Sequence, residues 1–347
     1  MNEAILFLET TPWALHLLKI MAVIGGLLLV VAYTVLAERR ICAFIQDRRG
    51  PNRVGPSGLL QPIADGLKFL FKENVLPGHV HKIYYILAPV MALIPALLIF
   101  AVIPFGSRLA SVPMVIADLN VGILWIFSIA SLGVYGIVLA GWASNSKYPF
   151  LGGIRSSAQM ISYEISMGMS VIGVFMLVGS LNLTRVVEYQ RDLWLIFKQP
   201  LGFLIFLVAA FAETNRLPFD LPESEQELVG GYHIEYGSMK FAMFFLAEYI
   251  NMITSSALMV TLFFGGWQTL WMPDFIQYNP WLVGVLHMGS FFFKVLLFML
   301  FFIWVRWTLP RFRYDQLMVL GWKVFIPLAL ANILVTSLII AVQTSHS

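Results

Sequence analysis

The sequence predicts an all-α polytopic membrane protein with about eight transmembrane helices and one interfacial amphipathic helix. Of the 347 residues, 59% are hydrophobic and only 12% are charged, whereas a soluble globular protein carries about 25% charged residues. Apolar runs of about 20 residues recur along the whole chain, and a run of that length crosses a ~30 Å hydrocarbon core. We therefore interpret residues 1–347 as a single transmembrane helical domain.

The expected spans cover residues 13–37, 83–104, 118–142, 158–180, 200–213, 240–264, 281–305 and 322–342. The fifth is short for a transmembrane helix unless it continues past Glu213 towards Pro218. The N-terminus opens with Glu3 and Glu9 instead of a basic segment. We therefore expect no cleavable signal peptide, and the first apolar run should remain in the mature protein.

Lysine and arginine are distributed unevenly over the expected loops. The loops after spans 1, 3, 5 and 7 hold 8, 2, 2 and 4 of them if Lys240 and Lys323, at the start of the following spans, are counted with the loops, and those after spans 2, 4 and 6 hold 1, 3 and 0. Loops rich in lysine and arginine stay on the cytoplasmic side of a membrane. The odd-numbered loops should therefore face the cytoplasm or the mitochondrial matrix, and both termini should face the other side.

The first inside loop, residues 38–82, begins with the basic stretch ERRICAFIQDRRGPNRVGPSG. For Arg40 and Arg49 we favour simple anchoring at the lipid headgroups. In the stretch that follows, Asp65, Lys68 and Lys72 lie on one helical face. Apolar residues recur at helical spacing on the other: Leu60, Ile63, Leu67, Leu70 and Phe71. The pattern indicates an amphipathic helix in the membrane interface, although a surface helix packed on the bundle has the same pattern.

The third inside loop, residues 211–240, is acidic. It holds one arginine, Arg216, and six carboxylates: Glu213, Asp220, Glu223, Glu225, Glu227 and Glu235. Acidic runs are usually a solvated surface, but here the acids alternate with Leu, Pro, Val, Gly and Tyr, which favours a packed segment. Crowded carboxylates raise one another's pKa and make protons easy to move.

Three ionisable residues lie inside the expected spans: Glu164, Glu248 and Lys294. Each costs about 2.5–3.5 kcal/mol to insert, so each needs a partner or a water-filled path. One such residue is explained equally well by a buried ion pair that fixes helix packing. Three ionisable residues on different spans favour a proton or ion pathway, especially because an acidic loop lies beside them.

Several classes of site are excluded or disfavoured. The single cysteine, Cys42, excludes an internal disulfide, a Cys-ligated iron–sulfur cluster and a Cys-type zinc site. A membrane haem would need paired histidines within the spans, and only His16 and His287 qualify, both near the outer ends. The chain holds no GxGxxG or P-loop pattern. We predict no metal site, no catalytic residue and no nucleic-acid binding.

Two long stretches resemble signatures of one known family: ERRICAFIQDRRGPNRVGPSGLLQPIADGLKFLFKE and AETNRLPFDLPESEQELVGGYHIEY. The shorter stretches ASNSKY and PRFRYDQLM match the same family. It is the family of the H-type membrane subunit of respiratory complex I, the proton-pumping NADH:quinone oxidoreductase, whose mitochondrial counterpart is subunit one. The resemblance covers essentially the whole chain.

The resemblance implies a core membrane subunit at the junction of the hydrophilic and membrane arms of a respiratory-chain translocase. Such a subunit forms the entrance and much of the wall of the chamber for ubiquinone or another quinone, its substrate. The flavin and the clusters belong to other subunits. The implied partners are the quinone-site and terminal-cluster subunits of the hydrophilic arm, the small and antiporter-like membrane subunits, and membrane lipids. The implied location is the bacterial inner membrane, or alternatively the mitochondrial inner membrane.

The resemblance also assigns residues. Arg39, Asp65, Phe245 and Arg306 match its quinone-path positions. The chain of acids that leads from the quinone chamber into the membrane matches Glu164, Glu213, Glu223, Glu225, Glu227, Glu235 and Glu248. Lys294 matches a polar residue inside the bundle.

Other functions stay open at this point. A stand-alone secondary transporter would use similar buried residues, but its site should lie at broken helices near the membrane midplane. The equivalent subunit of a membrane-bound hydrogenase, or of a complex fed by ferredoxin, would share the fold and many of the acids. A mere anchor for a hydrophilic arm would not need buried carboxylates.

Overall fold

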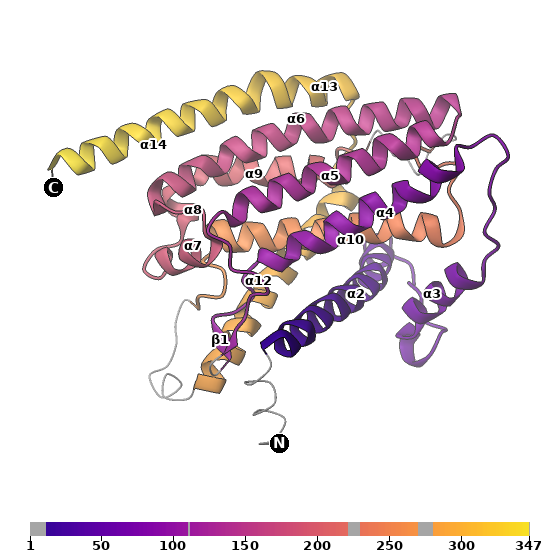
Figure 1. The fold of residues 1–347 in the computed structure, drawn as a ribbon, viewed down its shortest axis with the longest axis horizontal. Coiled ribbons are helices and arrows are strands. Elements are labelled where there is room, and N and C mark those ends of the chain that lie inside the picture. The colour runs from indigo at the N-terminus through magenta and orange to yellow at the C-terminus, as the bar shows by residue number, and fades with distance from the viewer. Residues whose placement is uncertain (1–11, 110–111, 221–229, 270–279, 347) are drawn as a thin grey trace.

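The computed structural model describes residues 12–109, 112–220, 230–269 and 280–346. The described chain is almost entirely helical (Figure 1). Its helices are α2 (Pro12–Ile45), α3 (Gln61–Phe71), α4 (Lys82–Ile99), α5 (Gly122–Ala143), α6 (Lys147–Val178), α7 (Leu183–Tyr189), α8 (Leu195–Lys198), α9 (Pro200–Glu213), α10 (Ser238–Phe263), α12 (Pro280–Thr308), α13 (Tyr314–Val319) and α14 (Ile326–His346). Short 3-10 turns cover Pro56–Gly58 and Phe100–Val102, a π-helical turn covers Leu320–Phe325, and β1 (Arg108–Leu109) pairs antiparallel with β2 (Val112–Pro113).

Within the described residues, seven helices are long and apolar enough to cross a membrane. The shorter apolar helix α9 (Pro200–Glu213) occupies the position of the expected fifth span. The prediction of an all-α polytopic membrane protein is therefore confirmed. The expected outer loops also contain elements that the sequence did not reveal, namely α7, α8 and the β1–β2 hairpin.

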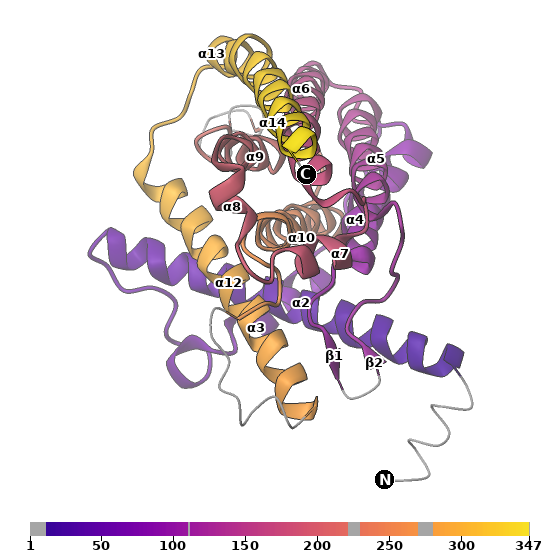
Figure 2. The same cartoon turned by 90° about the vertical axis from the view of Figure 1, so that its left-hand side faces the viewer.

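Helix α10 lies at the centre of the bundle (Figure 2). It packs against α4 and α12, and 72% of its most apolar stretch is buried inside the protein, whereas the corresponding share is 22% in both α2 and α14. The ends of α2 and α12 and the starts of α4 and α10 lie together on the right-hand side of Figure 1. The charged residues at these ends are therefore brought to one end of the bundle.

Helix α2 continues to Ile45, beyond the expected span end at residue 37. The sequence that follows the apolar run contains no glycine or proline before Gly50 and Pro51, so nothing interrupts the helix earlier. As a result, Glu38 and Arg39 lie on a helix instead of a loop. Glu38 is turned into the bundle and is only 4% exposed.

Helix α6 begins at Lys147, so most of the expected loop between spans 3 and 4 is helical. We interpreted its glycines as loop residues, and the structure gives them another role. A Cβ on Gly141 of α5 would lie 2.7 Å from the carbonyl oxygen of Pro149 and 3.3 Å from the Cα of Gly153 on α6. The absence of side chains there allows the backbones of α5 and α6 to approach closely.

Helix α3 confirms the amphipathic helix that the first inside loop predicts. None of its residues is buried, and its apolar side chains Leu70 and Phe71 are 65% and 86% exposed. Arg39 of α2 binds Asp65 of α3 at 2.7 Å, which ties this helix to the bundle. An exposed apolar face of this kind is typical of a helix that lies in a membrane interface.

Candidate functional site

Glu38 accepts three hydrogen bonds from three different parts of the chain. Arg216 Nη1 donates to its Oε2 at 2.9 Å, Tyr249 Oη donates to the same oxygen at 2.7 Å, and Arg306 Nη1 donates to Oε1 at 2.6 Å. The carboxylate is 6% exposed. One buried anion therefore joins α2, α10, α12 and the segment after α9.

Arg216 lies between two carboxylates. Its Nε is 2.8 Å from Glu248 Oε1, its Nη1 contacts Glu38, and its guanidinium lies 4.2 Å from the ring centre of Tyr249. Burial disfavours the charge, but Glu248 and Glu38 outweigh burial and raise the pKa of Arg216 well above its ordinary value. Arg216 is therefore a fixed cation.

The segment after α9 is held in place by amide side chains. Gln159 of α6 donates from Nε2 to the carbonyl oxygens of Ala212 and Phe219, at 2.8 and 2.9 Å, and to Asn215 Oδ1 at 3.2 Å. Asn215 in turn donates to Ser156 Oγ at 2.8 Å. These buried bonds go to backbone carbonyls at the end of α9 and in the segment beyond it, and they fix the position of Arg216.

An apolar cavity of about 480 Å³ lies between α2, α3 and α10. Three of the four predicted quinone-path residues line it, namely Arg39, Asp65 and Phe245. The remaining lining is mostly apolar, with side chains such as Val31 and Leu246. Its volume lies in the range of small-molecule binding sites, about 300–1,000 Å³.

A second cavity of about 350 Å³ adjoins the first and shares Val35, Arg39 and Phe245 with it. This cavity is polar, and its lining includes Arg306, the fourth predicted quinone-path residue. Other polar residues that line it are Glu38, Cys42, Arg48, Tyr249 and Trp307. The structure thus brings all four predicted residues to two adjoining cavities.

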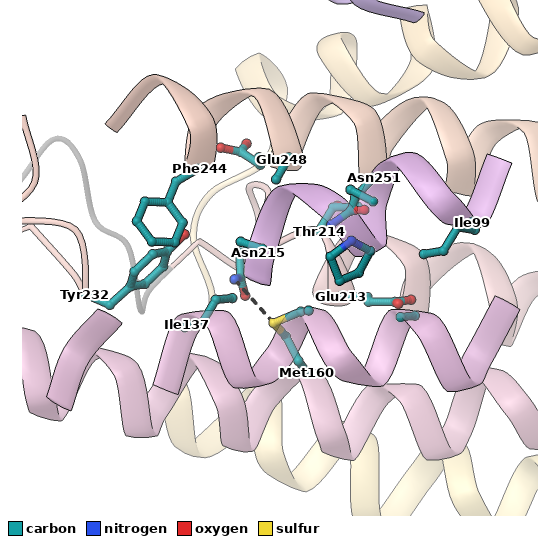
Figure 3. Close-up of a pocket in the computed structure, with 16 residues that line it drawn as sticks. Ile99, Ile137, Met160, Glu213, Thr214, Asn215, Tyr232, Phe244, Glu248 and Asn251 are labelled. Atoms are coloured by element: carbon teal, nitrogen blue, oxygen red, sulfur yellow. Dashed lines mark hydrogen bonds between the residues drawn. The ribbon is translucent and has the colours of Figure 1, made fainter. Parts of the chain in front are cut away.

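Three much smaller cavities continue from there. The first, about 10 Å³, is lined by Arg306, Arg216 and Glu248; the second, about 50 Å³, by Glu248 and Glu213; and the third, about 20 Å³, by Glu213 and Thr254. Figure 3 shows Glu248 of α10 and Glu213 of α9 around the second of these. A volume of about 10–15 Å³ holds one water molecule, so the row has room for single waters between the carboxylates.

Glu213 has one carboxylate oxygen, Oε2, that is buried and has no hydrogen-bond partner among the described residues. Such an atom needs a proton or a water molecule to satisfy it. Glu164 on α6 is hydrogen-bonded to Ser131 of α5 and interacts electrostatically with Glu213. The predicted acids Glu213 and Glu248 therefore line one cavity, and Glu164 lies close enough to Glu213 for their charges to interact.

Glu235 and Lys294 lie apart from these three acids. The backbone carbonyl of Glu235 accepts a bond from Tyr85 Oη at 2.5 Å, and its carboxylate is 3.8 Å from His79 Nε2. Lys294 Nζ donates to the carbonyl oxygens of residues 264, 266 and 268 at 2.9, 3.0 and 2.6 Å. Phe264 lies about 24 Å along the α10 direction from Glu248 at 1.5 Å per residue. The other predicted acids, Glu223, Glu225 and Glu227, lie outside the described residues.

Sequence reasoning missed Glu38, Arg216 and Tyr249 as members of the site. Two signals were present: Glu38 is the first charge after a long apolar run, and Arg216 is the lone arginine of the acidic loop. Their pairing across 178 positions of sequence is set only by the fold. Among the described residues, no group of three His, Cys, Asp or Glu side chains could hold a metal ion.

Comparison with known proteins gives the family of the chain. The family model described as NADH dehydrogenase matches residues 18–337. An H-type NADH-quinone oxidoreductase subunit of Geobacter metallireducens is 53% identical over 334 residues, which are 95% of this chain and 98% of the relative. NADH-quinone oxidoreductase subunit 8 of Rhodothermus marinus is 52% identical over 92% of this chain and 95% of the relative. The chain therefore belongs to the NADH dehydrogenase family, as an H-type membrane subunit of complex I.

Proposed function

We propose that this chain forms the quinone entrance and part of the quinone chamber wall, and that it couples quinone reduction to proton translocation. The apolar cavity between α2, α3 and α10 has the size and lining to hold an isoprenoid tail. A quinone that moves along it passes Arg39 and Phe245 and brings its head group to the polar cavity beside Arg306. Reduction then takes place at a cluster that belongs to another subunit.

The coupling of quinone reduction to proton movement begins with the negative charge of the reduced quinone. Negative charge on the reduced quinone attracts Arg306, which also donates to Glu38. When that bond weakens, the strengths of the two ion pairs that Arg216 forms, with Glu38 and with Glu248, change relative to each other. Glu248 shares a cavity with Glu213, so a proton can pass between them by way of water. The changed protonation of Glu213 then alters the protonation of Glu164 and, through Glu164, acts on the pumping subunits.

One observation carries this proposal: each cavity shares lining residues with the next. Phe245 and Arg306 connect the polar cavity with the first small one, Glu248 connects the first with the second, and Glu213 connects the second with the third. Ionisable residues occur at every junction after Phe245. A structural ion-pair network would not need to lie beside a row of cavities that begins at an open apolar pocket.

The experiment that tests the proposal compares two activities of the assembled complex carrying Glu213→Gln or Glu227→Gln. Quinone reductase activity should fall, because the row of carboxylates that responds to the negative charge of the reduced quinone loses a group that can change its protonation. Transfer from NADH to a hydrophilic artificial acceptor should be unchanged, since it bypasses the membrane. Equal loss of both activities in a fully assembled complex would rule out the coupling role.

The proposed location and partners follow from the same features. The relatives named above are bacterial, and we propose the bacterial inner membrane, with both termini on the periplasmic side. Further subunits of NADH-quinone oxidoreductase are the partners, with the hydrophilic arm on the end of the bundle that carries Glu38 and α3. Membrane lipids cover the exposed apolar faces of α2 and α14.

A further inference from the structure

Among the described residues that line the two larger cavities, more are positive than negative: Arg39, Arg48, Lys68 and Arg306 against Glu38 and Asp65. Arg39 pairs with Asp65, Arg216 pairs with Glu248, and Glu38 is shared between Arg216 and Arg306. Arg48 also lines the polar cavity, and it has no carboxylate partner in the described part of the chain. Its guanidinium contacts only neutral atoms, Gln46 Oε1 at 2.8 Å and Cys42 Sγ at 3.6 Å.

The uncompensated guanidinium stands beside an apolar space. The polar cavity that Arg48 lines shares Val35, Arg39 and Phe245 with the 480 Å³ apolar cavity. Arg48 itself is exposed and lines the polar cavity. The two cavities together therefore have the form of a site for a molecule with an anionic head and an apolar tail.

We propose that the two cavities bind a free long-chain fatty acid, with its carboxylate on Arg48 and its chain in the apolar cavity. The planar guanidinium matches a carboxylate with two parallel hydrogen bonds. The apolar cavity meets the polar one at Val35, Arg39 and Phe245, so a single alkyl chain that starts at the guanidinium can follow this path. The neutral carbonyl of a quinone gains less from the charge of Arg48 than a carboxylate does.

This inference rests on the proposed function, because the same cavities are the proposed quinone path. A fatty acid bound there blocks the passage between Val35 and Phe245, so it acts as a competitive inhibitor of quinone. The regulation is local: the concentration of free fatty acid in the membrane sets how many complexes accept quinone.

The test uses the purified whole complex in lipid nanodiscs, without quinone, and a palmitic acid that carries a photoreactive diazirine in its chain. Labelled peptides should contain residues of α2 and α10 that line the apolar cavity. Arg48→Gln should weaken labelling about tenfold, the loss expected for one charge-assisted hydrogen bond. Arg48→Lys should retain most of it. Arg49→Gln, a neighbouring arginine that does not line either cavity, should leave labelling unchanged.

Two further probes decide the chemistry of the head group. The matching diazirine alcohol, which lacks the charge, should label weakly and should not respond to Arg48→Gln. Equal labelling by acid and alcohol would overturn the proposal. So would equal labelling by a photoreactive phosphatidic acid, because that result would assign the site to a two-chain lipid. Label spread over the exposed faces of α2 and α14 would also overturn it.

A kinetic experiment separates this inference from the function on which it rests. Palmitate should raise the apparent KM for quinone and leave kcat unchanged. If palmitate labels the cavity and does not affect the KM for quinone, the quinone path is wrong and the fatty-acid site stands. If a quinone-site inhibitor binds in a manner that depends on Phe245 and palmitate never labels the cavity, the fatty-acid site is wrong and the quinone path stands.

Discussion

At the scale of single residues, one buried carboxylate organises the site. Glu38 receives three donors, two of them cationic, and is 6% exposed on its side chain. Removing one member of a buried ion pair leaves the others charged and unpaired, which costs more than the pair itself contributed. The positions of Arg216 and Arg306 relative to each other therefore depend on Glu38.

Glu38→Gln should destabilise the subunit by about 3–5 kcal/mol, because Arg216 and Arg306 lose their shared counter-charge. The measurement is the Tm of the purified complex, followed by the release of this chain. The control is Asp315→Asn, which breaks the pair between Arg313 and Asp315, whose side chains are 77% and 63% exposed. That change should not alter Tm measurably, since exposed pairs contribute little. An unchanged Tm for Glu38→Gln would contradict the shared-anion interpretation.

Arg306→Ala should raise the KM for quinone and weaken inhibitor binding roughly fivefold, about the effect of one lost hydrogen bond to a neutral acceptor. Assembly should suffer less than affinity. Arg306→Lys should keep the positive charge beside Glu38 and recover only part of the quinone affinity, because it lacks the guanidinium fork. Native gels report assembly, and inhibitor titration reports affinity. A loss of assembly with unchanged quinone affinity in the assembled fraction would refute the assignment of Arg306.

At the scale of elements, the sequence predicted helices better than it predicted their ends. Hydropathy located every apolar span, since an uninterrupted run of about 20 apolar residues has few alternatives. It placed the end of α2 at residue 37 and the start of α6 at residue 158, where the structure has Ile45 and Lys147. Both errors arise because these helices continue into polar or glycine-rich segments at the membrane surface. Hydropathy does not detect a helix in such segments.

Glycine contacts between α4 and α5 give a prediction at this scale. A Cβ on Gly136 would lie 2.7 Å from the backbone nitrogen of Ala92, and neither helix can yield there without moving its backbone. Gly136→Ala should therefore destabilise the bundle by about 1–3 kcal/mol, the usual effect of overpacking. We expect a lower Tm and less assembled complex.

The matched control is Gly168→Ala in α6, because a Cβ at Gly168 would meet nothing within 4 Å. There the substitution removes only a flexible helix residue, and it should raise stability slightly, by up to about 1 kcal/mol. Equal effects of the two substitutions would show that glycine flexibility matters here and that the close approach of α4 and α5 does not.

At the scale of the whole molecule, some residues of the site could be predicted from the family resemblance, and others became apparent only in the fold. Motif matching assigned Arg39, Asp65, Phe245 and Arg306, and the fold brings all four to two adjoining cavities. The partners of Glu38 could not be predicted, because they come from separated segments and depend on which helix faces meet. Lys294 does lie inside the bundle, but its ammonium group holds the backbone carbonyls of residues 264, 266 and 268. Glu235 lies in the loop before α10, and its carboxylate faces His79.

According to our proposal, quinone reduction at the polar cavity changes the protonation of Glu213 through the row of cavities. The most direct measurement is the redox-induced infrared difference spectrum of the reconstituted complex, in which changes at protonated carboxyl groups have their own bands. We expect quinone reduction to give a carboxyl signal that disappears in Glu213→Gln and persists in Glu188→Gln, which removes an exposed carboxylate of α7. An identical carboxyl signal in the wild type and in Glu213→Gln would contradict the claim.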